Sequence, residues 1–211
     1  LSAVFGEPRM VRGRVGDRKL RLFAVACCRS VHAHLWTRAS GPAIDVAERF
    51  ADGSATAGEL AAARAAIRGG LELYPGEPVY DPAYYACGTD APGDVEGCAF
   101  YAANVSTWPF TRSADDAQAA DARAAEVGRQ CRFLRDCVTV RPVTCDPSWR
   151  TEAVVGLARG MYESRDFAPM SVLADALDDA GCADPDVLAH CRGGGHHVRG
   201  CWVIDLLLGN G

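Results

Sequence analysis

The chain has 211 residues, 49% of them hydrophobic and 23% charged, which is typical of a folded globular protein of one domain. Its formal net charge of -5 argues against a nucleic-acid-binding protein, because binding to phosphates requires a basic surface. No apolar run approaches the roughly 20 residues that span a bilayer, so no membrane partner is expected either.

The N-terminal part is predicted to be an extended arm followed by helices. Residues 1–16 contain turn-forming Gly and Pro and little periodicity, which is typical of an arm. Between Asp17 and about Trp36, apolar residues recur every three or four positions and predict an amphipathic helix. Pro42 then opens a short helix that ends before Gly53. The apolar stripe of the first helix consists of Leu20, Phe23, Cys27, Val31 and Leu35.

Thr56 and Glu59 match a capping box, which predicts an Ala-rich helix from there to about Leu73. Residues 74–112 have a different composition, with five Pro that break regular structure and five Tyr that favour ordered packing. We expect a long irregular insertion in this range, with one short helix near residues 95–103. Such an insertion is either a lid over a ligand or a plain surface feature.

The second half of the chain again shows helical signals. Ser113 and Asp116 match a capping box that opens a helix to about Cys137, with an apolar stripe that includes Val127. No segment shows the alternation of a strand, so we predict an all-α fold, a single multi-helix domain over residues 1–211. Further helices are expected over residues 151–163, 170–180, 185–191 and 201–208.

Ten Cys and five His are the main chemical signal of the sequence. Every His lies close to a Cys, which favours zinc over a disulfide scaffold, because thiolate and imidazole are ligands that zinc prefers. Cys28 and His32 stand four residues apart, a spacing that lets two helical side chains hold one ion. Each of these signals has an alternative. Cys27, Cys131 and Cys137 are alternatively small core residues, and His32 alternatively only flanks a helix end. Cys87 and Cys98 are the candidates for a disulfide.

The closing block, residues 170–209, concentrates this signal. His190 and Cys191 end one helix, His197 follows a run of three glycines, and Cys201 opens the next helix. The glycines permit the tight turn that would fold these four side chains around one zinc ion. The alternatives are buried cysteines beside an exposed histidine loop, or a disulfide.

Acidic and basic side chains next to these candidate ligands extend the hypothesis. Asp175 and Asp179 share one face of the helix at 170–180, where Asp175 is a candidate oxygen ligand and Asp179 a candidate general base. Arg199 is a candidate for stabilising negative charge. A solvated acidic face is the alternative.

Three segments resemble an abundant group of uncharacterised planctomycete proteins. They are DRKLRLFAVACCR (17–29), LADALDDAGC (173–182) and HCRGGGHHVRGCWVIDLLLG (190–209), and members of the group close with a block of the form LADALEDAGC…HCR…HVRGCWVVDLLLG. The resemblance covers both ends of the chain and departs over residues 74–112. It implies that the closing block is a unit, and it carries over no activity and no catalytic residues.

Three functions follow from these observations. The first is a zinc-dependent hydrolase of an ester or phosphoester acting on a small-molecule substrate. The second is a non-enzymatic interaction module with a closed structural zinc site, and the third is a disulfide-tied exported protein. A cytoplasmic protein is the expectation, with export as the alternative because the sequence begins at Leu1 and a leader is expected to be missing. The oligomeric state has no signal in the sequence.

Overall fold

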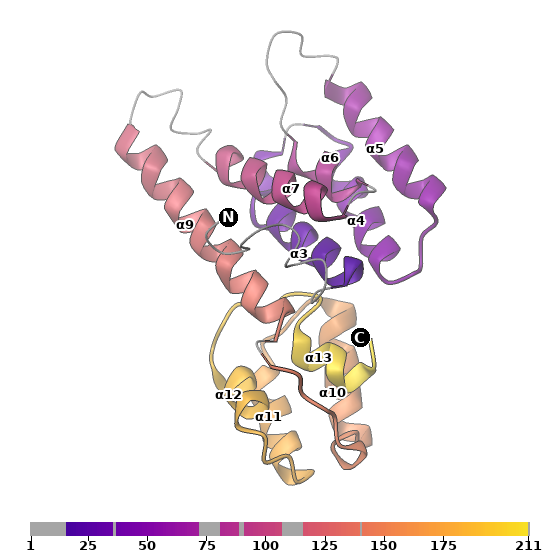
Figure 1. Cartoon of the computed structure of the whole chain (residues 1–211), viewed down its shortest axis with the longest axis vertical. Coiled ribbons are helices and arrows are strands. Elements are labelled where there is room, and N and C mark those ends of the chain that lie inside the picture. The colour runs from indigo at the N-terminus through magenta and orange to yellow at the C-terminus, as the bar shows by residue number, and fades with distance from the viewer. Residues whose placement is uncertain are drawn as a thin grey trace. The chain divides into compact units, whose positions relative to one another are not determined.

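The computed structural model describes residues 16–35, 37–71, 81–88, 91–106, 116–139 and 141–210. Within these ranges the chain forms helices and no strand, which confirms the predicted all-α fold (Figure 1). The predicted arm lies outside the described residues, apart from Gly16. The chain divides into two compact units, Leu1–Cys131 and Arg132–Gly211, which are described separately. The prediction of a single domain stays a prediction.

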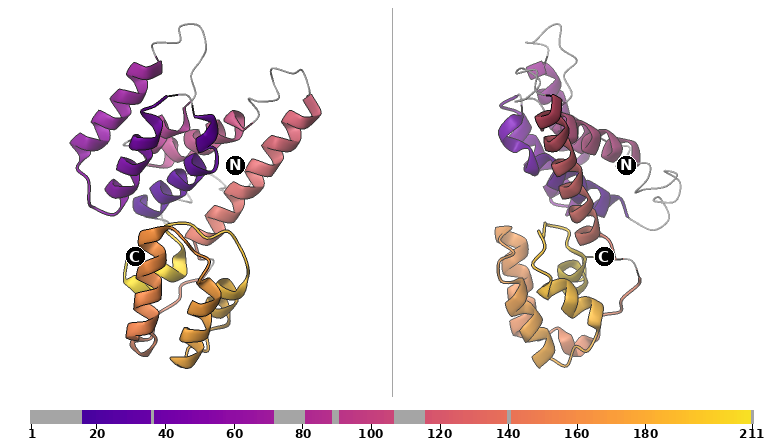
Figure 2. Two further views of the ribbon diagram at one scale, coloured as in Figure 1. Left: turned by 180° about the vertical axis from the view of Figure 1, so that it is seen from behind. Right: turned by 90° about the vertical axis from the view of Figure 1, so that its left-hand side faces the viewer.

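The first unit is built around helix α3 (Asp17–Ser30), which packs against α4 (Ser40–Ala51), α6 (Pro82–Ala86) and α7 (Ala91–Val105). Helix α5 (Ala57–Leu71) packs on α4 and α6. Figure 2 shows these helices from behind and from the side. Every residue of α3 from Leu20 to Cys28 is buried, because neighbouring helices cover most of its surface.

Most of the predicted stripe of the first helix is confirmed, since Leu20, Phe23, Cys27 and Val31 are buried, whereas Leu35 is half-buried. The helix itself ends at Ser30, earlier than expected, and the 3-10 turn η1 (His32–His34) follows it. The predicted pairing of Cys28 with His32 on one helix is therefore wrong. Cys28 is buried, whereas His32 is exposed beyond the helix end.

The capping box at the start of α5 is confirmed by two reciprocal hydrogen bonds. The backbone N–H of Glu59 donates to Thr56 Oγ1 at 3.2 Å, and the backbone N–H of Thr56 donates to Glu59 Oε2 at 2.8 Å. These bonds satisfy amides that the first helical turn leaves without partners.

The expected irregular insertion is helical where the structure describes it. Helices α6 and α7 occupy most of residues 82–105, and α7 is longer than the short helix predicted there. Asp81 caps α6 by accepting the backbone N–H of Ala83 at 2.9 Å, and Pro82 occupies the first helical position, which suits proline. Residues 72–80, 89–90 and 107–115 lie outside the described residues, so the lid hypothesis stays a prediction for them.

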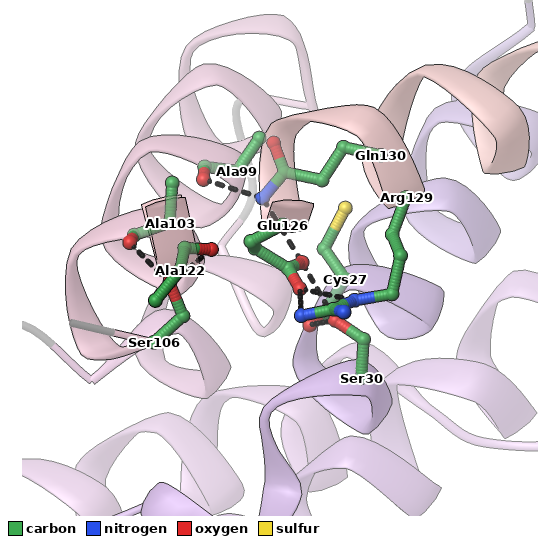
Figure 3. A network of polar contacts seen from close by, with 9 residues as sticks. All are labelled: Cys27, Ser30, Ala99, Ala103, Ser106, Ala122, Glu126, Arg129 and Gln130. Carbon is green, nitrogen blue, oxygen red and sulfur yellow. Dashed lines mark hydrogen bonds and ion pairs between the residues drawn. The ribbon is translucent and has the colours of Figure 1, made fainter. Parts of the chain in front are cut away.

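Helix α9 (Asp116–Cys137) buries a different face from the one predicted. Val127 is 37% exposed, while Glu126 and Gln130 are buried in the first unit. Glu126 accepts the Ser30 hydroxyl at 2.7 Å, and Gln130 Nε2 donates to the carbonyl of Ala99 at 2.9 Å (Figure 3). Polar side chains can occupy this buried face because most of their polar atoms have hydrogen-bond partners, although Gln130 Oε1 has none among the described residues. Ser113, the predicted cap, lies outside the described residues.

The second unit contains the helices predicted for the end of the chain. Two of them begin at side-chain caps: Thr151 accepts the backbone N–H of Val154, and Asp184 accepts those of Asp186 and Val187. Gly209 ends the last helix with φ +74°, a conformation that favours glycine. Buried apolar side chains from all of these helices form one core. The helices are α10 (Glu152–Ser164), α11 (Met170–Asp179), α12 (Pro185–Arg192) and α13 (Trp202–Leu208), preceded by η2 (Pro147–Trp149).

Among the described residues, no helix combines the length and the hydropathy that crossing a membrane requires.

Candidate metal centre

Four potential metal ligands converge in the second unit. They are Asp136 in the last turn of α9, His190 on α12, His197 in the loop that follows, and Cys201 at the N-cap of α13. One ligand atom from each residue lies within 4.8 Å of the other three. We call these four residues the Asp136 cluster.

Local structure explains how segments distant in sequence meet here. Capping by Asp184 fixes the start of α12, which buries Val187 in the core and leaves His190 on a neighbouring face. Gly194 and Gly200 then adopt positive φ values of 57° and 103°, conformations that suit glycine and let the loop turn back. The backbone N–H of Val198 donates to Asp136 Oδ2 at 2.8 Å, which attaches this loop to the end of α9.

The distances within the cluster are close to those of a tetrahedral zinc site. His190 Nε2 lies 3.2 Å from Cys201 Sγ, and Cys201 Sγ lies 3.9 Å from His197 Nδ1. Asp136 Oδ1 is closer to the two rings, at 3.0 Å from His190 Nε2 and 2.6 Å from His197 Nδ1. Zinc bonds of 2.0–2.3 Å in a tetrahedron place neighbouring ligand atoms about 3.3–3.6 Å apart. The cluster can therefore hold an ion once Asp136 and the two imidazole rings move apart by less than about 1 Å.

Asp136 is the negative charge of the cluster. Its burial alone would raise the pKa of the carboxyl group, but hydrogen bonds from His190, His197 and the amide of Val198 outweigh this and hold the pKa below its ordinary value. Because a carboxylate only accepts hydrogen bonds, His197 must carry a proton on Nδ1, the atom that contacts it.

Cys201 has the opposite tendency. Burial, and after it the charge of Asp136, raises the pKa of this thiol well above its ordinary value. In the absence of an ion the sulfur therefore keeps its proton. A metal ion reverses this preference, because it binds the thiolate and releases the proton.

The two rings differ in how their second nitrogen is used. The indole N–H of Trp202 donates to His190 Nδ1 at 3.0 Å, so the proton of the neutral His190 ring sits on Nε2, inside the cluster. His197 Nε2 is buried and has no hydrogen-bond partner within the described part of the chain. Nδ1 is the nitrogen of His197 that faces the cluster, so binding of an ion there would leave Nε2 without a partner.

The donor set fits zinc, and Trp202 is the residue that must adjust. Carboxylate, imidazole and thiolate are all zinc ligands. A metal-bound imidazole usually donates its other N–H to an acceptor, whereas His190 Nδ1 faces a second donor, the indole of Trp202. Binding of an ion at His190 Nε2 thus requires the indole to turn away.

Three of the five ligands predicted from the sequence belong to the cluster, namely His190, His197 and Cys201. Cys191 and Asp175 lie outside it. Cys191 packs in the apolar core of the unit, where burial raises its pKa to about 12. The side chain of Asp175 is 77% exposed and pairs with Arg192 at 3.6 Å.

Neither candidate catalytic residue is part of the cluster. Asp179 is exposed at the end of α11. The guanidinium of Arg199 lies over the ring of Tyr162, 4.2 Å from its centroid. The solvated acidic face that was the alternative describes Asp175 and Asp179, since both are exposed. Asp175 also pairs with Arg192, as does Asp178.

Sequence reasoning missed Asp136, which lies far upstream of the other ligands. The available signal was its position on the long helix. Asp136 lies three residues after the buried Phe133 and directly before the buried Cys137, so it falls on the buried face rather than on the solvent face.

Comparison of the chain with protein-family models, with curated proteins and with solved structures finds no match. The relationship to the planctomycete group stays a prediction.

Proposed function

We propose that the second unit is a zinc-binding module and that Asp136, His190, His197 and Cys201 are the four ligands. The observation that carries this proposal is the convergence of four chemically suitable donors from α9, α12, the following loop and α13. The distances between the four donor atoms support it, because they lie within about 1 Å of those of a tetrahedral zinc site.

The number of ligands favours a structural ion over a catalytic one. A catalytic zinc typically has three protein ligands and keeps one position open for water, whereas a structural zinc has four. The Asp136 cluster offers four donors, two of them buried. Hydrolysis of an ester or phosphoester would also need a base beside the ion, and Asp179, the candidate from the sequence, is exposed and outside the cluster. We therefore infer that the ion stabilises the loop and ties three helices together.

Cobalt substitution tests both the ligands and the coordination number. The full chain, stripped with a chelator, is titrated with Co²⁺, which is spectroscopically visible where Zn²⁺ is not. We expect one equivalent to bind, with the intense visible bands of four-coordinate cobalt and a thiolate-to-cobalt charge-transfer band in the near ultraviolet. Zinc should displace the cobalt and abolish both features.

Neighbouring cysteines provide a matched control. Cys201→Ala should remove the charge-transfer band, whereas Cys191→Ala, which alters a buried thiol ten residues away, should retain it. Absence of stoichiometric binding, or loss of the band in Cys191→Ala instead, contradicts the ligand set. Weak bands of a five- or six-coordinate ion, together with aryl-ester hydrolysis that chelation abolishes, contradict the structural role and favour the hydrolase.

A further inference from the structure

A pair of buried cysteine side chains lies in the first unit, apart from the metal centre. The sulfur atoms of Cys28 and Cys98 are 3.4 Å apart and both side chains are 0% exposed. Cys28 belongs to α3 and Cys98 to α7, two helices that pack directly against each other (Figure 1). The two residues are 70 positions apart in the sequence, so folding alone brings their thiols together.

The surroundings select this pair among the buried thiols of the unit. Cys98 Sγ donates to the carbonyl of Ala24 on α3 at 3.3 Å, which holds it against that helix. Cys87, which the sequence analysis paired with Cys98, instead directs its thiol to the carbonyl of Ala43 on α4 at 3.3 Å. The contact between sulfur atoms therefore joins Cys98 to Cys28 and not to Cys87.

We propose that Cys28 and Cys98 form a disulfide when the chain meets a small-molecule disulfide such as oxidised glutathione, and that this bond joins α3 to α7. The thiolate of one cysteine attacks a sulfur of the small disulfide, which releases one small thiol and leaves a mixed disulfide. The second cysteine, as thiolate, attacks the protein sulfur and releases the second small thiol. Two protein thiols are oxidised, and the small disulfide takes up the two electrons and two protons.

The geometry needs a modest adjustment to close the bond. A disulfide has a sulfur–sulfur distance of about 2.05 Å, so the two atoms must approach by about 1.4 Å from their observed separation of 3.4 Å. Rotation of the side chains and a small shift of the two helices supply this movement. The loop that the bond closes is long, and a long closed loop restricts the unfolded chain most, so the oxidised chain should be the more stable form.

The burial of the pair decides when the reaction occurs. Burial raises the pKa of both thiols, so few thiolates form while α3 and α7 are packed together. Attack on the small disulfide is therefore fastest before the helices have packed, and packing of α3 on α7 then brings the second thiol to the mixed disulfide. A chain that folds among small disulfides acquires the bond, whereas a chain that folds among reduced thiols keeps the dithiol.

Refolding in glutathione buffers tests the proposal. The full chain is unfolded in urea with reductant, refolded at graded ratios of oxidised to reduced glutathione, quenched with acid and alkylated. Cleavage by trypsin and by a protease that cuts after Glu96 separates Cys87 from Cys98. We expect peptide 22–29 joined to peptide 97–112, with a mass lower by two hydrogens than the sum of both. The midpoint of urea unfolding should rise on oxidation and fall again on reduction.

Adjacent cysteines serve as controls. Cys28→Ala should abolish the cross-link and the redox-dependent shift of the midpoint, whereas Cys27→Ala should retain both. On the α7 side of the cross-link, Cys98→Ala should likewise abolish it, whereas Cys87→Ala should retain it. A link between Cys87 and Cys98, an indiscriminate mixture of pairs, or free Cys28 and Cys98 at every glutathione ratio overturns the proposal.

Discussion

Replacement of Asp136 by asparagine should destabilise the metal-free second unit strongly. The carboxylate is 3% exposed and accepts three N–H groups, from His190, His197 and the backbone of Val198. Asparagine has nearly the same shape but only one acceptor oxygen, so its amide N–H₂ must face at least one of these donors. A buried donor without a partner costs about 1–3 kcal/mol, and the remaining bonds lose the strength that the charge gave them.

The sum of these effects is a loss of about 2–5 kcal/mol in the free energy of unfolding. Urea unfolding with chelator present, followed by circular dichroism, measures it. Asp175→Asn is the matched control, because it makes the same chemical change at an exposed carboxylate, and it should leave the unfolding midpoint unchanged. Equal midpoints for the two variants would refute the central role of Asp136.

The stability difference between the native chain and Asp136→Asn should also depend on pH, with a defined sign. The pKa of Asp136 is lower in the folded chain than its ordinary value of about 3.9. Its contribution to stability is therefore fully present above that ordinary value and is lost as the pH falls through the lower, folded value. The difference in unfolding free energy between the native chain and Asp136→Asn should shrink over this acidic range, and a difference that grows there would contradict the pKa shift.

Further predictions concern the ion and the first unit. Zinc should change the tryptophan fluorescence of the chain, because the Trp202 indole loses its acceptor on His190. Trp202→Phe should abolish that change, and an unchanged response in this variant would contradict the movement of Trp202. The apparent zinc affinity, measured by competition with a chelator, should rise by up to about tenfold per pH unit, since Cys201 releases a proton, and a flat profile excludes this release. Glu126→Ala should lower the unfolding free energy by about 2–4 kcal/mol, because Ser30 and other donors lose a fully buried acceptor. Val127→Ala next to it, at an exposed site, should have no measurable effect in the same urea experiment.

The sequence predicted those elements whose signals are local. The apolar spacing of α3 and the capping box of Thr56 and Glu59 act within one or two helical turns, so they could be recognised without knowledge of the tertiary structure. Helix α6 was missed because Pro82 was treated as a breaker, although at the first helical position proline is favoured.

The features that the sequence did not predict depend on long-range contacts. Val127 belongs to an apolar pattern, yet the partners available to Glu126 and Gln130 bury the polar face of α9 instead. Asp136 joins ligands more than fifty positions downstream, and its hydrogen bonds to His197 and Val198 are fixed by the fold rather than by spacing.

The site around Asp136 can be filled in two ways, by the protons of its hydrogen bonds or by a metal ion. In the metal-free form, hydrogen bonds to Asp136 from both imidazole rings and from the backbone of Val198 hold the site together. The apolar core of the unit does not include Asp136, His190 or His197. If the cluster binds zinc as proposed, loss of the ion should return the residues to this assembled arrangement, whereas a zinc finger unfolds without its metal. Such an ion would then exchange with the surrounding pool according to metal supply and acidity, without a cycle of unfolding and refolding.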